Sequence, residues 1–370
     1  MLKNIKLKII GFFYKRILRP CLFLIDPENI HNQVIILGNL LGKSQISRGL
    51  IGLFFNYTSP RLNQKILNIN FPNPVGLAAG FDKNAKLISI LPSVGFGFME
   101  IGSITGNPCS GNPKPRLWRL VKSEGLVIHY GLNNKGCESI SKNLKGVAFK
   151  IPIGINIAMT NSPENNSTEM AIGDYLKSAT AFKNIGDFLT INISCPNTLG
   201  GQPFLEPQKL NELLTELDKI KLNKPVFVKL SPDLEKIEID KILEIIKNHH
   251  INGIICSNLS KKRKNVKIID SEIPEKGGIS GKPLKNLSDN LLAYIYKKEK
   301  NRFILIGCGG IFSAEDAYRK IRLGASLVEL ITGMIYEGPQ LISDINHELI
   351  KLLDRDGFKN IQEAIGVDNH

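Results

Sequence analysis

The segment from Asn192 to Thr198, with the sequence NISCPNT, carries the residue types best suited to chemistry in this chain. Two carboxamides and one thiol lie close together here, directly after an apolar run typical of a strand. A carboxamide donates and accepts hydrogen bonds without charge, which suits recognition of an amide- or imide-containing ring. A thiol with a lowered pKa acts as a general base. Most single cysteines are buried core residues, but the position between Asn192 and Asn197 favours a catalytic Cys195.

Two lysines follow or end apolar runs and predict cations beside the same site. Lys83 comes after the turn at residues 78–80, and Lys229 lies inside the run 225–230. A lysine within an apolar run is rarely a solvated surface residue. Both cations suit a carboxylate substrate, a cofactor phosphate or an electron-rich flavin, and the residues alone leave these three open.

Glycine-rich segments follow three apolar runs and predict close approach of the backbone to an anion. They are 277–281, 307–310 and 332–333, and the alternative interpretation is plain tight turns. Unencumbered N–H groups at such places in a barrel bind phosphate. The chain has no Walker A motif and no GxGxxG after a strand, which counts against a nucleoside triphosphate or a Rossmann-bound dinucleotide. A phosphate-bearing cofactor held by a barrel indicates FMN, or a sugar phosphate.

Eight short apolar runs, most of them separated by amphipathic stretches, supply the framework for these residues. Strands that alternate with helices predict a parallel sheet, and eight such units favour a closed (β/α)8 TIM barrel of the α/β class over an open doubly wound sheet. The stretch 103–151 is too long for one crossover and predicts an inserted hairpin. The runs are 74–79, 97–102, 152–158, 187–193, 225–230, 253–258, 303–308 and 327–331.

Polar side chains gather at the C-terminal ends of these runs. Ser103 follows the second run, Asn156 ends the third, and Ser257 with Asn258 ends the sixth. A strand that is packed on both faces should be apolar along its length. Because barrel enzymes place their active sites at this face, the polar ends predict a site there.

The first 45 residues predict a small helical extension to a barrel domain at 46–370. Residues 1–25 contain no uninterrupted apolar run of the ~20 residues that a bilayer span needs, and no cleavage site follows them. Their apolar residues recur at helical spacing between basic ones, which suits a helix in the interface of an anionic membrane. A second helix is expected from the Asp26 cap to about Leu41. The alternative is a two-helix subdomain packed on the main body. Residues 43–60 are predicted to be a linker.

The net charge of +14 indicates an anionic partner or a lysine-rich solvated surface. The sequence has no arginine-rich or aromatic-interleaved run and no helix-turn-helix or zinc-finger spacing, so we expect no nucleic-acid partner. The six cysteines form no CxxC pair, which predicts neither a metal site nor a disulfide framework. Scattered cysteines of this kind indicate a reducing compartment.

Nine short segments, in order and at fitting intervals, resemble the dihydroorotate dehydrogenase family. The similarity runs from about Asp26 to about Pro339. The segments are LAAGFDKN (77–84), EIGSIT (100–105), NPKPRLWRL (112–120), GLNNKG (131–136), GINI (154–157), NISCPNT (192–198), VKLSPD (228–233), GGISGKPL (277–284) and GCGGI (307–311).

This resemblance implies oxidation of dihydroorotate to orotate in pyrimidine synthesis, with FMN as the hydride acceptor. By position, Cys195 would be the base that removes a proton from C5, while a hydride leaves C6 for the flavin. Four residues would hold the substrate: Lys83, Asn192, Asn197 and Asn258. The residues around FMN would be Ala79, Gly80, Ser103, Asn156, Asn192, Lys229, Ser257, Gly281, Gly310 and Thr332.

The segment IDPENIH (25–31) is similar to the extension of the class 2 enzymes, which are peripheral membrane proteins that reduce a quinone. The resemblance therefore implies a membrane quinone as acceptor, His31 and Arg119 at the quinone tunnel, and a place on the cytoplasmic face of a bacterial-type inner membrane. Some residues depart from the class 2 pattern: Cys195 replaces a serine, as in class 1, Leu132 a phenylalanine, Ile128 and His129 an Asn-Arg pair, Leu259 a hydroxyl residue and Ile331 a tyrosine.

Two further hypotheses stay open on the sequence. One is a related FMN barrel enzyme that uses a soluble acceptor or another ring substrate. The other is an inert barrel that binds membranes or nucleic acid through its positive charge.

Overall fold

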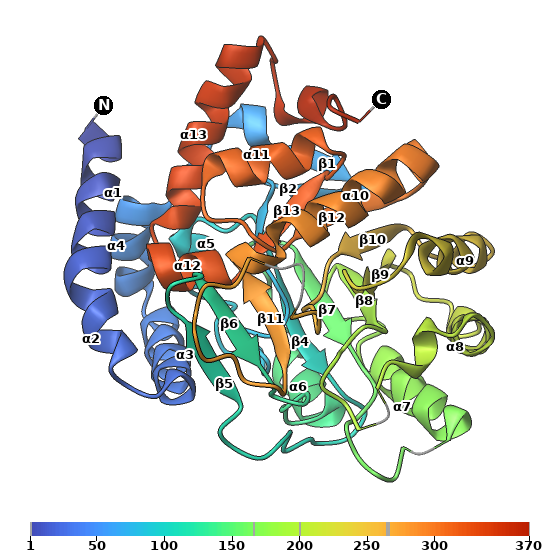
Figure 1. Cartoon of the computed structure of the whole chain (residues 1–370). Helices are drawn as coiled ribbons and strands as arrows, with labels where there is room; N and C mark the ends of the chain where they lie inside the picture. Colours follow the sequence, from blue (N-terminus) through green and yellow to red (C-terminus); the bar gives the residue numbers. More distant parts are fainter. Residues whose placement is uncertain (1, 166, 200, 264–266, 370) are drawn as a thin grey trace.

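Eight parallel strands close into a barrel at the centre of the molecule (Figure 1). The computed structural model describes residues 2–165, 167–199, 201–263 and 267–369. Neighbours follow chain order, and β13 pairs back to β3, so the predicted (β/α)8 fold is confirmed. The strands are β3 (Val75–Leu77), β4 (Phe98–Ile104), β7 (Ile153–Ile157), β8 (Phe188–Asn192), β9 (Val226–Leu230), β10 (Gly253–Cys256), β12 (Ile304–Cys308) and β13 (Leu327–Leu330).

Helices surround this barrel and bury its outer face. Helices α8 (Pro207–Asp218) and α9 (Lys236–Ile246) lie in two of the amphipathic stretches that separate the predicted apolar runs. The helices after β3 are α5 (Leu91–Val94), α6 (Cys137–Leu144), α7 (Thr168–Ala181), α8 (Pro207–Asp218), α9 (Lys236–Ile246), α10 (Lys285–Glu299), α11 (Ala314–Arg322), α12 (Thr332–Glu337) and α13 (Leu341–Asp356).

Phenylalanine rings fill the barrel at the N-terminal ends of its strands. The ring centroids of Phe188 and Phe227 are 5.3 Å apart, and those of Phe98 and Phe188 are 6.4 Å apart. Each of these rings lies against a glycine of the preceding or following strand: a Cβ on Gly76 would lie 2.3 Å from the Phe98 ring. Gly154 faces Phe188 and Gly253 faces Phe227 in the same way. The aromatic layer closes this end, so a site inside the barrel can open only at the other end.

An antiparallel sheet of three strands extends over the open end of the barrel. It consists of β5 (Leu117–Leu120), β6 (Gly125–Ile128) and β11 (Gly278–Gly281), in the order β11-β6-β5. The hairpin of β5 and β6 confirms the insertion predicted within 103–151. The segment 277–281 was expected to be a loop, and this expectation is wrong for residues 278–281. They form β11 because their backbone pairs with residues 125–128 of β6.

The amino-terminal residues fold into helices that lie along one side of the barrel (Figure 1). Asp26 caps α3 by accepting a hydrogen bond from the Asn29 N–H, as predicted. The expected linker at 43–60 is wrong over most of its length, because α4 begins there after its Ser44 cap and packs on α3 and α5. The elements are α1 (Leu2–Phe13), a π-helical turn (Tyr14–Leu18), α2 (Arg19–Phe23), α3 (Pro27–Lys43) and α4 (Gln45–Phe55).

Polar contacts fasten this extension to α12 and the residues beside it. The Tyr14 hydroxyl donates to the Ile335 carbonyl at 2.7 Å, and Lys15 pairs with Glu337 at 2.9 Å. Arg19 donates to the Tyr336 carbonyl at 2.9 Å. The extension is therefore packed on the main body, as one of the two alternatives predicted. No helix in the described part of the chain is long and apolar enough to cross a bilayer.

Candidate active site

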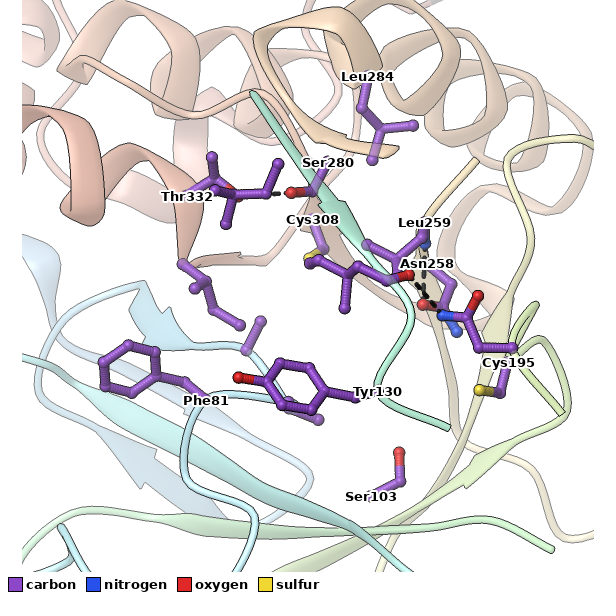
Figure 2. Close-up of a pocket in the computed structure, with 18 of the residues that line it drawn as sticks. Phe81, Ser103, Tyr130, Cys195, Asn258, Leu259, Ser280, Leu284, Cys308 and Thr332 are labelled. Carbon is purple, nitrogen blue, oxygen red and sulfur yellow. Dashed lines mark hydrogen bonds between the residues drawn. The ribbon is translucent and has the colours of Figure 1, made fainter. Parts of the chain in front are cut away.

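A cavity opens at the C-terminal ends of the barrel strands. Figure 2 shows Phe81 and Tyr130 on one side of this cavity and Cys195 with Asn258 on another. Most of the residues predicted for substrate and cofactor line it. These are Cys195, Lys83, Asn192, Asn197, Asn258, Ala79, Gly80, Ser103, Lys229, Ser257, Gly281, Gly310 and Thr332.

Asn156 is the predicted cofactor residue that does not line the cavity. It is fully buried behind Ser103, whose hydroxyl donates to the Asn156 Oδ1 at 2.5 Å. The Asn192 Nδ2 in turn donates to the Ser103 Oγ at 2.9 Å, and Asn258 donates to the Asn192 Oδ1 at 3.1 Å. Asn156 thus orients the polar groups of the cavity from behind.

Lys229 lies between two buried carboxyl groups that the sequence analysis did not select. Its Nζ is 3.4 Å from the Glu100 Oε2 and 3.6 Å from the Glu329 Oε2, and both glutamates are fully buried. Burial and the nearby Glu100 raise the pKa of Glu329 well above its usual range. The two carboxyl groups raise the pKa of Lys229 despite its burial, so this lysine is charged. The sequence did hold a signal for these two residues, since each is the one glutamate inside a largely apolar strand, β4 or β13.

Cys195 is partly exposed to the cavity, and its thiol is not the activated one that the sequence analysis expected. Burial raises the pKa of the Cys195 thiol to about 11, and the charge of Lys261 and a backbone N–H lower it only in part. The expectation of a lowered pKa is wrong because the effect of burial outweighs that of the backbone N–H and of the Lys261 charge. At neutral pH the group is a thiol, and its basic form grows as the pH rises.

Lys83 presents a cation to the cavity without a carboxylate partner. Its Nζ lies 3.2 Å from the His31 Nε2 and 4.0 Å from the centre of the Tyr130 ring. Within the described ranges, no carboxylate oxygen lies within 4.0 Å of this ammonium group. Burial lowers the pKa of Lys83 to about 8. Such a cation is suited to an incoming anion. Tyr130, like Glu100 and Glu329, was not predicted from the sequence.

Ile128 and His129 stand where the class 2 pattern has an Asn-Arg pair. The backbone of Ile128 and the residues around it hold Asn197. The Asn197 Nδ2 donates to the Ile128 carbonyl at 2.9 Å. Asn112 donates to the Asn197 carbonyl at 3.0 Å and lies 3.1 Å from the His129 Nε2. The Ile128 carbonyl therefore fixes the carboxamide of Asn197 at the cavity wall, and Asn112, which was not predicted from the sequence, holds the Asn197 backbone.

Glycines at two rims of the cavity take backbone conformations that favour glycine. Gly281 has φ +88° and Gly310 has φ +73°. Between them the Ser280 and Thr332 hydroxyls are 2.8 Å apart (Figure 2). Backbone and hydroxyl groups thus converge at the predicted phosphate position.

The two residues predicted for a quinone site have different environments. His31 lines the cavity and packs edge-on against Phe81 with ring centroids 5.0 Å apart. Arg119 does not line it: its guanidinium donates to the carbonyls of Leu22, Phe23 and Ile25 at the end of α2. Arg119 therefore anchors the extension.

A closed parallel barrel with a cavity at the C-terminal ends of its strands, where Lys, Asn and Ser side chains reach it, defines a barrel enzyme of the TIM type. A family model described as dihydroorotate dehydrogenase matches residues 61–353. The chain belongs to the dihydroorotate dehydrogenase family.

Similar proteins carry the name dihydroorotate dehydrogenase (quinone). One from Gloeobacter violaceus is 38% identical over 95% of this chain and 98% of its own length. Another from Helicobacter acinonychis is 39% identical over 94% of this chain and 97% of its own length. A solved structure of ligand-free DHODH from Eimeria tenella has a TM-score of 0.84 and 31% identity, and the match covers 93% of this chain and all of that one.

Proposed function

We propose that this protein oxidises (S)-dihydroorotate to orotate in pyrimidine synthesis, with FMN as cofactor and a membrane quinone as electron acceptor. The observation that carries the proposal is the single cavity that Cys195 shares with Lys83, Asn192, Asn197 and Asn258. Relatives of similar length that are named for the quinone-linked enzyme support it.

The residues at the cavity fit FMN. A Cβ on Gly80 would have only the Ile331 side chain near it, at 4.0 Å, so glycine leaves space there for a flat ring. The hydroxyls of Ser280 and Thr332 and the backbone near Gly310 suit its phosphate. Lys229 places a buried positive charge nearby. Bound FMN would supply the acceptor for a hydride from the substrate and pass the electrons on to the quinone.

The chain's own residues hold the substrate and move one proton. Lys83 binds the carboxylate of dihydroorotate as a charge-assisted pair. The carboxamides of Asn192, Asn197 and Asn258 hold its ring, whose amide groups both donate and accept. The Cys195 Sγ, in its thiolate form, accepts the proton that leaves C5.

Anaerobic addition of dihydroorotate to the purified protein tests the proposal. We expect bound flavin to lose its visible absorbance, because the reductive half-reaction needs only substrate and cofactor. Orotate is the matched control, since it should bind without bleaching the flavin. A protein that binds flavin but is not bleached would contradict dihydroorotate as the substrate.

One observation favours a second candidate, a related flavin enzyme with another ring substrate. Ile128 and Leu259 line the cavity, where the family pattern has an asparagine and a hydroxyl residue. An apolar wall favours a ring that makes fewer hydrogen bonds. Bound flavin that is not bleached by dihydroorotate would favour this second candidate over the first.

The extension exposes a large apolar surface, which supports contact with a membrane. Fifteen of the 22 large apolar side chains exposed in the described part of the chain lie before residue 56. Basic residues accompany them, as in helices that lie in the interface of anionic bilayers. We place the protein on the cytoplasmic face of the membrane, with residues 1–45 as the membrane-associating part and 46–370 as the catalytic domain.

Deleting residues 1–45 should abolish sedimentation with anionic vesicles and reduction of a membrane quinone. The deletion removes 11 of the 15 exposed large apolar side chains that lie before residue 56, while the cavity keeps Cys195 and the three asparagines. Flavin reduction at saturating dihydroorotate should persist. The full chain in high salt is the control for purely electrostatic binding. A truncated protein that still sediments would refute the assignment.

A further inference from the structure

We propose that helix α3 of the extension sets the affinity of the active site for its anionic substrate. Its residues Glu28 and His31 act as positioning residues that keep Lys83 in place and charged. The inference rests on the proposed function in one respect, namely that Lys83 binds the substrate carboxylate. It adds that the extension forms part of the substrate site as well as the membrane surface.

His31 reaches Lys83 directly. The His31 Nε2 lies 3.2 Å from the Lys83 Nζ, and the imidazole is wedged against Phe81. Burial, and then the charge of Lys83, lower the pKa of His31 to about 2, so the ring is neutral. A neutral ring accepts a hydrogen bond from the ammonium at Nε2 and carries its proton on Nδ1. It thereby orients Lys83 and leaves the positive charge free for a ligand.

Glu28 acts on Lys83 through Arg116 and Tyr130. Lys83 and Arg116 both lie by the Tyr130 ring, with the Nζ 4.0 Å and the guanidinium carbon 5.2 Å from its centre. Glu28 pairs with Arg116 at 2.9 Å, and both side chains are more than nine-tenths buried. Glu28 therefore cancels the charge of Arg116, which would otherwise repel the ammonium of Lys83.

The charge on Lys83 depends on few groups, and α3 carries two of them. Its pKa of about 8 reflects burial, which lowers it, Glu28 and Asp82, which raise it, and Arg116, which lowers it. The neutral His31 and the Tyr130 ring also contact Lys83, and Lys114 is a second cation that pairs with Glu28, at 3.5 Å. The ammonium is present below this pKa and is lost as the pH rises through it. Removing the Glu28 charge should shift that loss to lower pH.

Orotate titrations of the full-length flavin-loaded protein between pH 6 and 10, followed by the flavin absorbance, test the inference. Glu28→Gln should weaken orotate binding by about 10-fold near pH 8 and move the midpoint of its pH dependence downward, because Lys83 loses its charge earlier. His31→Ala should weaken binding by about 10-fold, the value of one hydrogen bond to a charged group, and His31→Gln should recover part of it. Gln33→Ala, on the exposed face of α3, is the matched control.

The outcomes separate the inference from the proposed function. If the unmodified protein neither binds orotate nor is bleached by dihydroorotate, the proposed function fails, and the inference fails with it. If the unmodified protein does both, and the Glu28 and His31 variants bind orotate with its affinity and pH profile, only the inference is overturned. Thermal unfolding checks each variant, and if Glu28→Gln does not fold, the two His31 variants decide alone.

Discussion

Cys195→Ala should slow flavin reduction by dihydroorotate by about 10²- to 10⁴-fold, the usual contribution of a positioned general base. One other thiol, that of Cys308, lines the cavity in the described part of the chain, and it lies within the electrostatic influence of Lys229 and Glu329. The substitution removes few contacts, so the flavin should stay bound. Anaerobic stopped-flow mixing gives the rate directly, without a contribution from the quinone half-reaction.

The pH dependence identifies the base. Because the pKa of Cys195 is raised to about 11, the rate for the unmodified protein at saturating dihydroorotate should keep rising with pH from pH 7 to 10. Cys195→Ser should shift this profile to still higher pH, because a hydroxyl is the weaker acid. Cys21→Ser, a change to an exposed thiol outside the cavity, is the control. A Cys195→Ala rate equal to that of the control would remove this residue from the role of base.

Lys83→Ala should weaken binding of dihydroorotate and orotate by about 10- to 150-fold, since charge-assisted hydrogen bonds contribute about 1.5–3 kcal/mol. Binding to the unmodified protein should also decline above pH 8, as the Lys83 ammonium deprotonates. The variant should lack this decline. Titration with orotate, followed by the flavin absorbance, measures both effects.

Lys86→Ala is the matched control, because this exposed lysine lies three residues away on the same loop. It should bind orotate with unchanged affinity, and both variants should retain flavin. If Lys83→Ala keeps the affinity and the pH dependence of the control, the carboxylate is bound elsewhere and the assignment of Lys83 fails.

The barrel could be predicted from the sequence because each strand is a short apolar run that is buried on both faces. The insertion at 103–151 could be predicted from length alone. Helix α4 was missed, and its exposed face also carries large apolar side chains, with Ile46 77% and Leu53 72% exposed. The strand at 278–281 was missed because its partner, β6, lies about 150 residues earlier in the chain.

The lining of the cavity could be predicted where a polar residue ends or follows a barrel strand, as for Cys195 and Asn258. The site residues whose role depends on a partner far away in the chain could not be predicted. Tyr130 matters because Lys83 and Arg116 lie by its ring, and Glu28 because it pairs with Arg116 across 88 positions of the chain. The environment of a titratable group was equally hidden, since the sequence shows the Cys195 thiol but not the burial that raises its pKa.

The glycines beneath the phenylalanine layer bear on how variation in such barrels is interpreted. Gly76, Gly154 and Gly253 touch no part of the cavity, yet even a methyl group at each would collide with a ring. A glycine that does not vary at the start of a barrel strand can therefore reflect the phenylalanine ring packed against it, and not a role in catalysis. Each phenylalanine and the glycine against which it packs form one packing unit. A larger residue in place of the glycine would be tolerated only with a smaller residue in place of the phenylalanine.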